Sequence, residues 1–269
     1  MRPFLKWPGG KYRLVPKIKE KLPTGRRLIE PFAGSCAVSL NTEYENYLIN
    51  DINEDLINLY KTLQAKGDKF IRRCRLYFTD KKNTPEKFKE FRKQFNKIED
   101  IETKSVLLLY LNRHGYNGLI RYNSQGEFNV PFGRYKKPYF PEEEMKFFYE
   151  KFKKAKFTCI DFEEIMMKAK PGDVIYCDPP YIPLTSTSNF TSYSSGGFGI
   201  GEQERLARVA AKVAAKGIPV IISNHKMESI IQLYKGADIE QFPVRRFISC
   251  NGANRNAVTE ILAVFGRGG

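Results

Sequence analysis

The stretch Asp173–Tyr181, which reads DVIYCDPPY, decides how this chain folds. Its first five residues form a β-rich apolar run, which predicts a buried strand. Asp178-Pro179-Pro180-Tyr181 then ends the strand, because each proline lacks an N–H and pushes the residue before it into an extended conformation. We therefore predict a stiff corner at the carboxyl end of a strand, with a carboxylate and carbonyl groups free of sheet partners.

Similar β-rich runs recur on both sides of this strand, and amphipathic helical segments lie between several of them. One such segment, 202–216, is bounded by glycine at both ends. This alternation predicts an α/β fold with a mostly parallel sheet, and such sheets bind ligands at the carboxyl ends of their strands. The other strands that we predict span residues 27–32, 47–51, 157–162, 219–224 and 261–265.

The middle of the chain has a different pattern. It begins with basic helical segments, and between residues 112 and 135 short runs flank glycine-containing turns, which predicts a β-hairpin. We predict an α/β domain formed by residues 1–55 and 157–269, with an inserted, mainly helical domain of residues 56–156 that carries the hairpin. The small polar residues of segment 182–201 predict a mobile lid.

The formal net charge is +15, and the middle of the chain carries most of the imbalance. Residues 61–156 hold 24 Lys and Arg residues against 12 Asp and Glu residues. Such clustering favours nucleic acid as the partner, with an anionic membrane surface or a merely solvated helical face as the alternatives.

Several other classes of protein are disfavoured by composition. No stretch approaches the roughly 18 uninterrupted apolar residues of a membrane span, and basic residues interrupt the apolar ones near the N-terminus, against a signal peptide. Five scattered cysteines argue against a disulfide framework and for a reducing compartment, and two histidines without a CxxC pair argue against zinc. We expect a cytoplasmic protein without a metal or a membrane partner.

The corner at Asp178 has acceptors that suit a planar base with an amino group. The carboxylate and the Pro179 carbonyl can take N–H donors, and the Tyr181 ring offers a stacking surface. An ordinary strand-to-loop turn is the alternative. Cys177 lies within the strand, and we interpret it as a buried core thiol.

Other strand ends offer candidate ligand-binding residues. Gly34, in the turn after a first strand, would let a ligand approach the backbone before a helix begins, and Asp51 could accept ribose hydroxyls at the end of the second strand. Asp161 and Phe162 end the third predicted strand and could border an adenine ring, although Phe162 could equally belong to the core.

The N-terminal segment Phe4–Lys11, FLKWPGGK, contains the only tryptophan of the chain. The turn at Gly9 and Gly10, followed by Lys11 at a helix start, suits a carboxylate-bearing ligand. A tryptophan buried in the core is the alternative for Trp7.

The hairpin offers candidates for DNA recognition. Arg121 and Arg134 could each bind guanine O6 and N7. Tyr116, Asn117 and Leu119 could wedge into a base stack. Each of these residues taken alone could instead be structural or contact a phosphate.

Together these motifs resemble the Dam family of DNA adenine N6-methyltransferases over nearly the whole chain. The segments that carry the resemblance are Phe4–Lys11, Glu30–Gly34, Asn112–Pro138, Asp178–Tyr181 and Ile222–His225. The resemblance implies a Rossmann-like methyltransferase sheet with an inserted DNA-recognition domain. It also implies transfer of a methyl group from S-adenosylmethionine to a flipped adenine in duplex DNA, with GATC as the site.

The resemblance assigns roles to individual residues. The catalytic motif is Asp178, Pro179, Pro180 and Tyr181. The cofactor site comprises Trp7, Gly9, Gly10, Lys11, Phe32, Gly34, Asp51, Asp161, Phe162 and Asp178. The DNA-binding residues are Lys6, Tyr116, Asn117, Leu119, Arg121, Asn123, Pro131 and Arg134, with Tyr116 and Asn117 entering the stack beside the extruded adenine.

Several alternatives stay open at this point. The chain could be a DNA-binding regulator that keeps the fold without activity, or could methylate an amino group of an RNA base or a protein glutamine. Within the favoured interpretation it acts as a monomer in the bacterial nucleoid or is encoded by a phage. It would then serve replication and mismatch repair, or restriction-modification.

Overall fold

The computed structural model describes residues 1–182, 197–245 and 257–266. Its strands form one sheet of seven, in the order β3-β2-β1-β4-β5-β7-β6. The first five are parallel, whereas β7 is antiparallel to both β5 and β6. The strands are β1 (Arg27–Glu30), β2 (Asn46–Asn50), β3 (Lys156–Thr158), β4 (Asp173–Cys177), β5 (Val220–His225), β6 (Asp238–Arg245) and β7 (Ala257–Phe265).

The prediction of an α/β fold with a mostly parallel sheet is confirmed, and β6 is a strand that the sequence patterns did not indicate. The α-helices are α1 (Val15–Lys21), α2 (Glu54–Lys66), α3 (Asp68–Arg75), α4 (Pro85–Phe95), α5 (Ile101–His114), α6 (Glu142–Lys151), α7 (Phe162–Met167), α8 (Ile200–Ala214) and α9 (Glu228–Leu233). The 3-10 turns are η1 (Lys11–Leu14), η2 (Ser39–Asn41), η3 (Asp80–Lys82) and η4 (Tyr116–Gly118).

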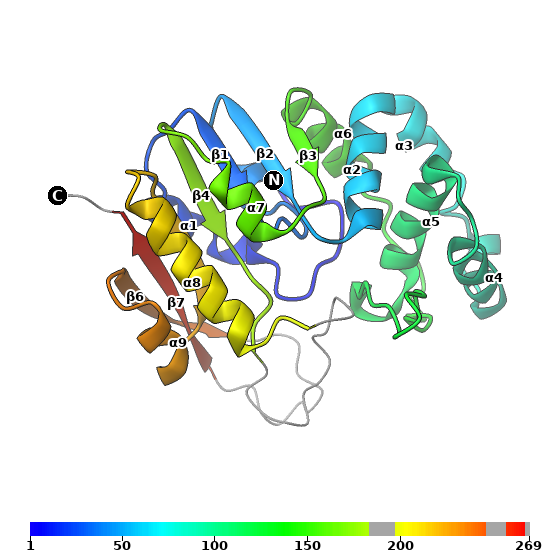
Figure 1. Cartoon of the computed structure of the whole chain (residues 1–269). Coiled ribbons are helices and arrows are strands. Elements are labelled where there is room, and N and C mark those ends of the chain that lie inside the picture. The colour runs from blue at the N-terminus through cyan, green and yellow to red at the C-terminus, as the bar shows by residue number, and fades with distance from the viewer. Residues whose placement is uncertain (183–196, 246–256, 267–269) are drawn as a thin grey trace.

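Both faces of the sheet are covered by helices (Figure 1). Successive residues of a strand point to opposite faces, so Leu28 packs in a core with α1 and α2, whereas Ile29 packs with α7, α8 and α9. The second core includes Cys177, which is fully buried; its interpretation as a core thiol is confirmed.

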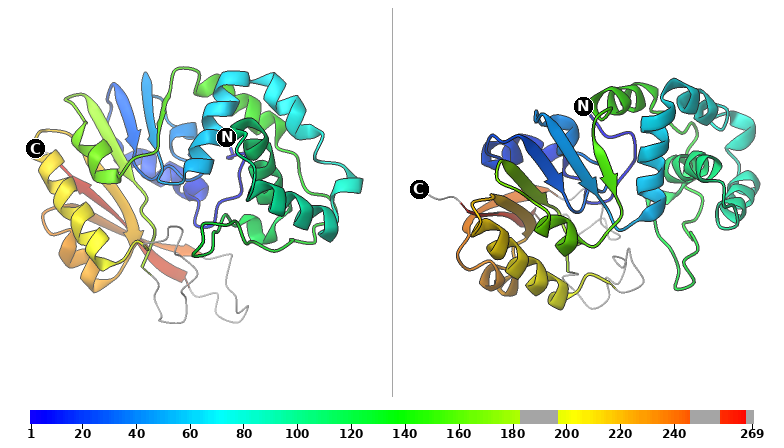
Figure 2. Two further views of the ribbon diagram at one scale, coloured as in Figure 1. Left: turned by 45° about the vertical axis from the view of Figure 1, so that its right-hand side comes forward. Right: turned by 45° about the horizontal axis from the view of Figure 1, so that its top comes forward.

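Helices α2 to α6 gather beside the β3 edge of the sheet (Figures 1 and 2). Their aromatic residues continue the core of the sheet: the ring of Tyr60 in α2 lies 4.8 Å from Phe148 in α6 and 5.7 Å from Phe157 in β3. Because one apolar core spans both parts of the chain, the division into two domains stays a prediction.

Two local predictions are wrong. The third strand ends at Thr158, and Asp161 instead caps α7 by accepting the N–H of Glu163 at 2.9 Å, so Asp161 and Phe162 do not end a strand. No α-helix follows β1 in the described residues up to β2. Left-handed backbone at Gly34 (φ 47°) and Cys36 (φ 59°) interrupts that connection, which forms only the turn η2.

The predicted hairpin has less regular pairing than expected. Within residues 112–135, all of which the structure describes, antiparallel pairing is limited to isolated bridges, Gly115 with Phe132 and Tyr122 with Phe128. The turn η4 interrupts the first arm. Most of the segment interpreted as a lid, residues 182–201, lies outside the described residues.

Asn50 organises the carboxyl ends of three neighbouring strands. This residue, 1% exposed, donates to the carbonyls of Pro31 (3.0 Å) and Ile160 (2.9 Å). It accepts from the Thr158 hydroxyl (2.8 Å) and the Ile160 N–H (3.1 Å). Its amide therefore satisfies groups after β1 and around the end of β3 that would otherwise be buried without partners.

We predict that Asn50→Leu lowers the free energy of unfolding by about 2–4 kcal/mol, because the apolar side chain leaves buried carbonyl and N–H groups unsatisfied. Asn46→Leu is the matched control, since Asn46 is exposed at the start of the same strand. It should change the free energy by less than about 0.5 kcal/mol. Denaturant unfolding measures both, and equal effects of the two substitutions would contradict the prediction.

Candidate active site

Asp178 lies at the carboxyl end of β4, where the sheet continues to β1 on one side and β5 on the other. This is the position where the strand order reverses and where α/β sheets bind ligands. Its Oδ1 accepts from Lys11 Nζ at 2.9 Å and from Ser223 Oγ at 3.0 Å. Three segments, the N-terminal segment, β4 and β5, thus converge on one carboxylate.

Tyr181 lies against the same group. Lys11 Nζ is 4.4 Å from the centre of its ring, and the His225 ring lies at 4.0 Å. The hydroxyl donates to Glu260 at 3.4 Å. Burial, with Asp178 nearby, raises the pKa of Tyr181 well above its usual value, so the phenol is neutral.

Lys11 lies at a helix start, as the sequence predicts, and the helix that it begins is the 3-10 turn η1, which α1 follows directly. Its ammonium donates to the Gly9 carbonyl (3.1 Å) as well as to Asp178. The Gly10 N–H bonds to the Trp7 carbonyl at 3.0 Å, which closes the turn. Lys11 is only 4% exposed. The ammonium therefore faces the corner at Asp178.

Trp7, Gly34 and Asp51 form one arrangement beside this corner. A Cβ at Gly34 would lie 2.7 Å from Trp7 Nε1, so only glycine allows the indole to approach this closely. Asp51 accepts the N–H groups of Gly34 and Asn53, each at 2.9 Å. Burial raises the pKa of Asp51. The carboxylate therefore holds the loop after β1 beneath the indole.

The aromatic residues predicted at the strand ends lie together. The Phe32 ring is 5.2 Å from that of Phe162, and Phe198 contacts both. Asp161 is bound by both terminal nitrogens of Arg205, at 3.1 and 2.7 Å. The contribution of Phe198 and the pairing of Asp161 with Arg205 were not predicted from the sequence.

Glu30 is a buried acid at the end of β1. It accepts a hydrogen bond from Ser39, and burial raises its pKa to about 8. The carboxyl group is therefore mostly protonated at neutral pH. This leaves Asp178 as the negative charge that faces Lys11.

The N-terminal segment also contacts the stretch where the hairpin was predicted. Asn112 accepts from the Lys6 N–H (2.9 Å) and donates to the carbonyls of Lys6 and Gly118 (both 2.8 Å). Lys6 Nζ lies 3.7 Å from the centre of the Tyr135 ring. Burial lowers the pKa of Lys6 to about 8, and Arg113 adds to this.

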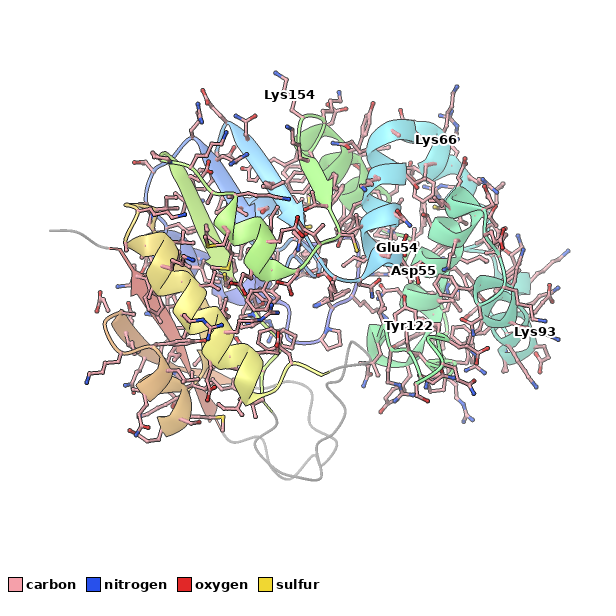
Figure 3. The ribbon with its side chains drawn as sticks, in the orientation of Figure 1. Glu54, Asp55, Lys66, Lys93, Tyr122 and Lys154 are labelled. Atoms are coloured by element: carbon pink, nitrogen blue, oxygen red, sulfur yellow. The ribbon has the colours of Figure 1, made fainter. Side chains whose placement is uncertain are left out.

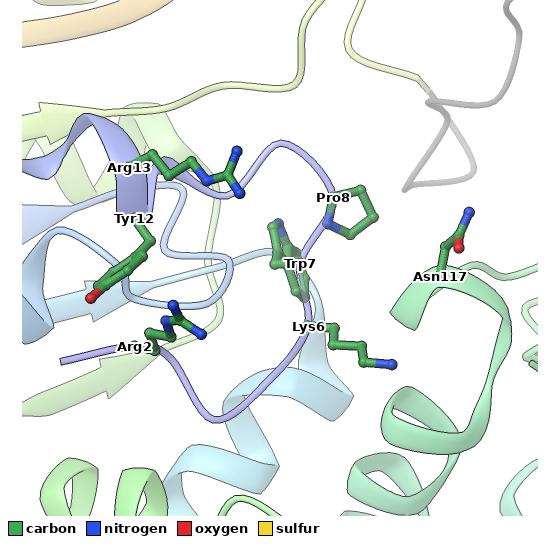
Figure 4. A pocket seen from close by; sticks show the side chains of 7 residues that line it. All are labelled: Arg2, Lys6, Trp7, Pro8, Tyr12, Arg13 and Asn117. Atoms are coloured by element: carbon green, nitrogen blue, oxygen red, sulfur yellow. The ribbon is translucent and has the colours of Figure 1, made fainter. Parts of the chain in front are cut away.

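A pocket of about 490 Å³ opens along this segment (Figure 4). It brings together Lys6, Trp7 and Asn117, which the sequence singled out for the cofactor or for DNA. None of the described residues that line it is acidic. The lining residues are Arg2, Lys6, Trp7, Pro8, Tyr12, Arg13 and Asn117.

The remaining candidates for DNA contact differ in their surroundings. Tyr116 is 52% exposed, Arg134 and Pro131 are exposed, and Leu119 is half-buried. Arg121 Nε already donates to Asn129 Oδ1 at 2.8 Å. Asn123 Oδ1 accepts from the N–H groups of Gln125 and Glu127, which gives Asn123 a structural role in the turn.

Several contacts hold this stretch against the helices. The Tyr122 hydroxyl donates to Asp55 at 2.8 Å (Figure 3), and Arg92 of α4 donates to the Val130 carbonyl at 2.9 Å. The labelled basic side chains come from separate parts of the chain. Lys66 ends α2, Lys93 lies in α4 and Lys154 lies in the turn after α6, and all three point outward in Figure 3. Part of the positive charge is therefore a solvated surface, as the alternative interpretation of the charge allowed.

Within residues 1–182, 197–245 and 257–266, no helix is long and apolar enough to cross a membrane. The same residues contain no group of three or more His, Cys, Asp or Glu side chains that could hold a metal ion.

Comparison with known proteins gives the family. Residues 7–246 match the model of the D12 class N6 adenine-specific DNA methyltransferases. The chain is 49% identical to a DNA adenine methylase of Vibrio cholerae, with 98% of this chain and 96% of that protein aligned. It is also 49% identical to one from Serratia marcescens (98% of each) and 47% identical to one from Escherichia coli K12 (98% and 95%).

A solved structure described as precorrin 8w decarboxylase, from Methanobacterium thermoautotrophicum, aligns with 99% of this chain. Its identity of 12% and TM-score of 0.43 are too low to bear on fold or function. The family match and the full-length relatives agree with each other and with the DPPY corner. The chain therefore belongs to the D12 class of N6 adenine-specific DNA methyltransferases, enzymes that methylate adenine in DNA.

Proposed function

We propose that the chain transfers the methyl group of S-adenosylmethionine to the N6 atom of an adenine flipped out of duplex DNA, with GATC as its site. The observation that carries this proposal is the convergence of Asp178, Lys11, Ser223 and Tyr181 at the switch point of the sheet. An acceptor beside an aromatic ring suits a planar base whose amino group must be oriented.

The residues around the switch point fit the cofactor. Gly34 lets the Trp7 indole lie against the loop after β1. Phe32, which is half-buried, offers an apolar surface for an adenine ring, and Phe162, 5% exposed, supports Phe32 from the core. Asp51 and Lys11 supply an acceptor and a cation for the polar groups, with Gly9 and Gly10 in the adjoining turn. When bound, S-adenosylmethionine supplies an electrophilic methyl group on a sulfonium.

The corner can prepare the amine for attack. Asp178 and the Pro179 carbonyl accept the two N6–H donors, which withdraws the nitrogen lone pair from the ring and directs it at the methyl group. Tyr181 stacks on the flipped base. Transfer would form the N6–C bond as the methyl group leaves sulfur, with S-adenosylhomocysteine as the leaving group. Positive charge would develop on N6 beside Asp178 until N6 releases one proton to water.

The stretch 112–135 is proposed to recognise the duplex. Removing adenine from the stack costs a few kcal/mol, which exposed Tyr116 and Asn117 would offset by filling the space left by the base. Lys6, Leu119, Arg121 and Pro131 would contact base pairs, with Asn123 and Arg134 beside them. We also propose that residues 56–156 act as the recognition domain, and that one chain suffices for transfer.

Tritium transfer from S-adenosylmethionine to two short duplexes tests the whole proposal. One duplex contains GATC and the other has the same bases scrambled. We expect label in the first duplex alone, recovered as N6-methyladenine. Equal label in both duplexes would exclude the proposed site, and no label in either duplex would exclude the proposed duplex substrate.

We predict that Asp178→Asn lowers kcat by about 10²–10³-fold, because the neutral amide stabilises developing positive charge poorly. Affinity for the duplex, measured by gel shift, should change less than about threefold, because the amide oxygen can still accept from Lys11 and the loss falls on the transition state. Asp68→Asn, an exposed acid in α3, is the control and should retain full transfer. An Asp178→Asn enzyme with the wild-type rate would remove Asp178 from the mechanism.

A second prediction uses the lowered pKa of Lys6, about 8. Raising the pH from about 7 to about 9 removes the charge of Lys6. The slope of log affinity against log salt for the duplex should then become shallower by about one. In Lys6→Met the salt slope should already be shallow at the lower pH and should not change when the pH is raised. If the slope of Lys6→Met changed with pH as much as that of wild type, a group other than Lys6 would be titrating.

A further inference from the structure

A buried polar cluster lies behind the corner at Asp178. Gln203 is in the first turn of α8, Asn224 is in β5 and Tyr234 directly follows α9; their exposed fractions are 0%, 1% and 0%. Asn224 Nδ2 donates to Gln203 Oε1 (3.0 Å) and to the Tyr234 hydroxyl (2.9 Å). The hydroxyl donates to Gln203 Oε1 at 3.1 Å, which closes the triangle.

The side-chain nitrogen of Gln203 takes no part in this triangle and faces the corner at Asp178. Its Nε2 donates to the Pro180 carbonyl at 3.1 Å. Pro179 and Pro180 have no N–H, so the corner cannot fasten itself through its own amides as an ordinary turn does. Pro179 is buried, and in the described part of the chain no donor bonds to its carbonyl, the oxygen that the proposed mechanism assigns to the substrate.

The triangle also fixes which way the Gln203 amide points. If the amide turned over, Nε2 would face the donors Asn224 Nδ2 and the Tyr234 hydroxyl, and Oε1 would face the Pro180 carbonyl. Both changes would leave buried polar groups without partners, which is costly. Asn224 and Tyr234 therefore keep the donor of Gln203 directed at Pro180.

We propose that Gln203, oriented by Asn224 and Tyr234, is a positioning residue that fixes the peptide after Pro180 and with it the acceptors of the corner. This inference rests on the proposed catalytic role of Asp178–Tyr181. The hydrogen bond fixes the plane of the peptide between Pro180 and Tyr181. Because the φ angles of both prolines are rigid, fixing this peptide plane also restricts the positions of the Pro179 carbonyl and of Asp178.

Gln203→Met tests the proposal, because methionine has a similar length and no donor. Gln64→Met is the matched control: Gln64 in α2 also donates to backbone carbonyls, of Phe152 (2.6 Å) and Ala155 (2.9 Å), far along the chain from the corner. We expect Gln203→Met to lower kcat roughly tenfold to a hundredfold, as loss of positioning does. KM for the duplex should change less than about threefold.

Gln64→Met should lower Tm and leave kcat within about twofold of wild type. A Gln203→Met enzyme with wild-type kcat, or with a change confined to KM, would overturn the proposal. So would an equal loss of kcat in Gln64→Met, since that would trace the effect to stability alone.

Gln203→Glu gives a second readout that does not depend on how well the first variant folds. A protonated glutamic acid can donate to Pro180 and accept from Asn224 and Tyr234, whereas a carboxylate cannot donate; burial favours the protonated form. We expect the ratio of its kcat to that of wild type to rise as the pH falls. A ratio that stays low at the lowest pH, where the protonated acid restores the donor to Pro180, would overturn the proposal.

Asp178→Asn, assayed beside these variants, separates the two hypotheses. If Asp178→Asn is inactive and Gln203→Met is fully active, the corner is catalytic and only the positioning role of Gln203 is wrong. If Asp178→Asn keeps the wild-type rate, the catalytic assignment of the corner fails and the inference about Gln203 fails with it.

Discussion

The ion pair between Lys11 Nζ and Asp178 Oδ1 is the contact on which the candidate site depends. A lysine with 4% of its side chain exposed needs a partner, because an isolated buried ammonium is very costly. The pair therefore holds the N-terminal segment against the end of β4. From there the segment places Trp7 over Gly34, and Lys6 against Asn112 and Gly118. One electrostatic contact thus joins the strand end, the loop after β1 and the stretch 112–135.

Much of the fold could be predicted because its signals are local. The apolar runs of β1, β2, β4 and β5 are each recognisable within about six residues, and two prolines end β4. The predictions of secondary structure that were wrong depend on long-range contacts or on unusual backbone conformations. The short β3 depends on Asp161 as a helix cap, and the missing helix after β1 depends on left-handed Gly34 and Cys36. Strand β6 owes its place to pairing with β7 rather than to its own pattern.

The residues of the candidate site also differ in whether the sequence could indicate them. Asp178, Tyr181, Lys11 and Gly34 could be found because their residue types are unusual for their positions, and the structure brings them together. The roles of their partners could not be found. Ser223 lies 45 positions from Asp178, in the segment Ile222–His225 of the resemblance, which gave it no role. Gln203 lies 23 positions from Pro180, and a glutamine in a helix has no sequence signal of its own. Their roles follow only from burial and contact.

The two oxygens of Asp178 have different surroundings, and this difference bears on the proposed chemistry. Lys11 and Ser223 both bond to Oδ1, and in the described residues no donor occupies Oδ2. An incoming N6–H can therefore bond to Oδ2 without displacing Lys11. Because Glu30 is mostly protonated at neutral pH, it adds little negative charge to compete for the same cation. Lys11 and Ser223 fix the orientation of the carboxylate, and Gln203 donates to the Pro180 carbonyl beside it. In the proposed mechanism, Asp178 thereby keeps one oxygen for the substrate.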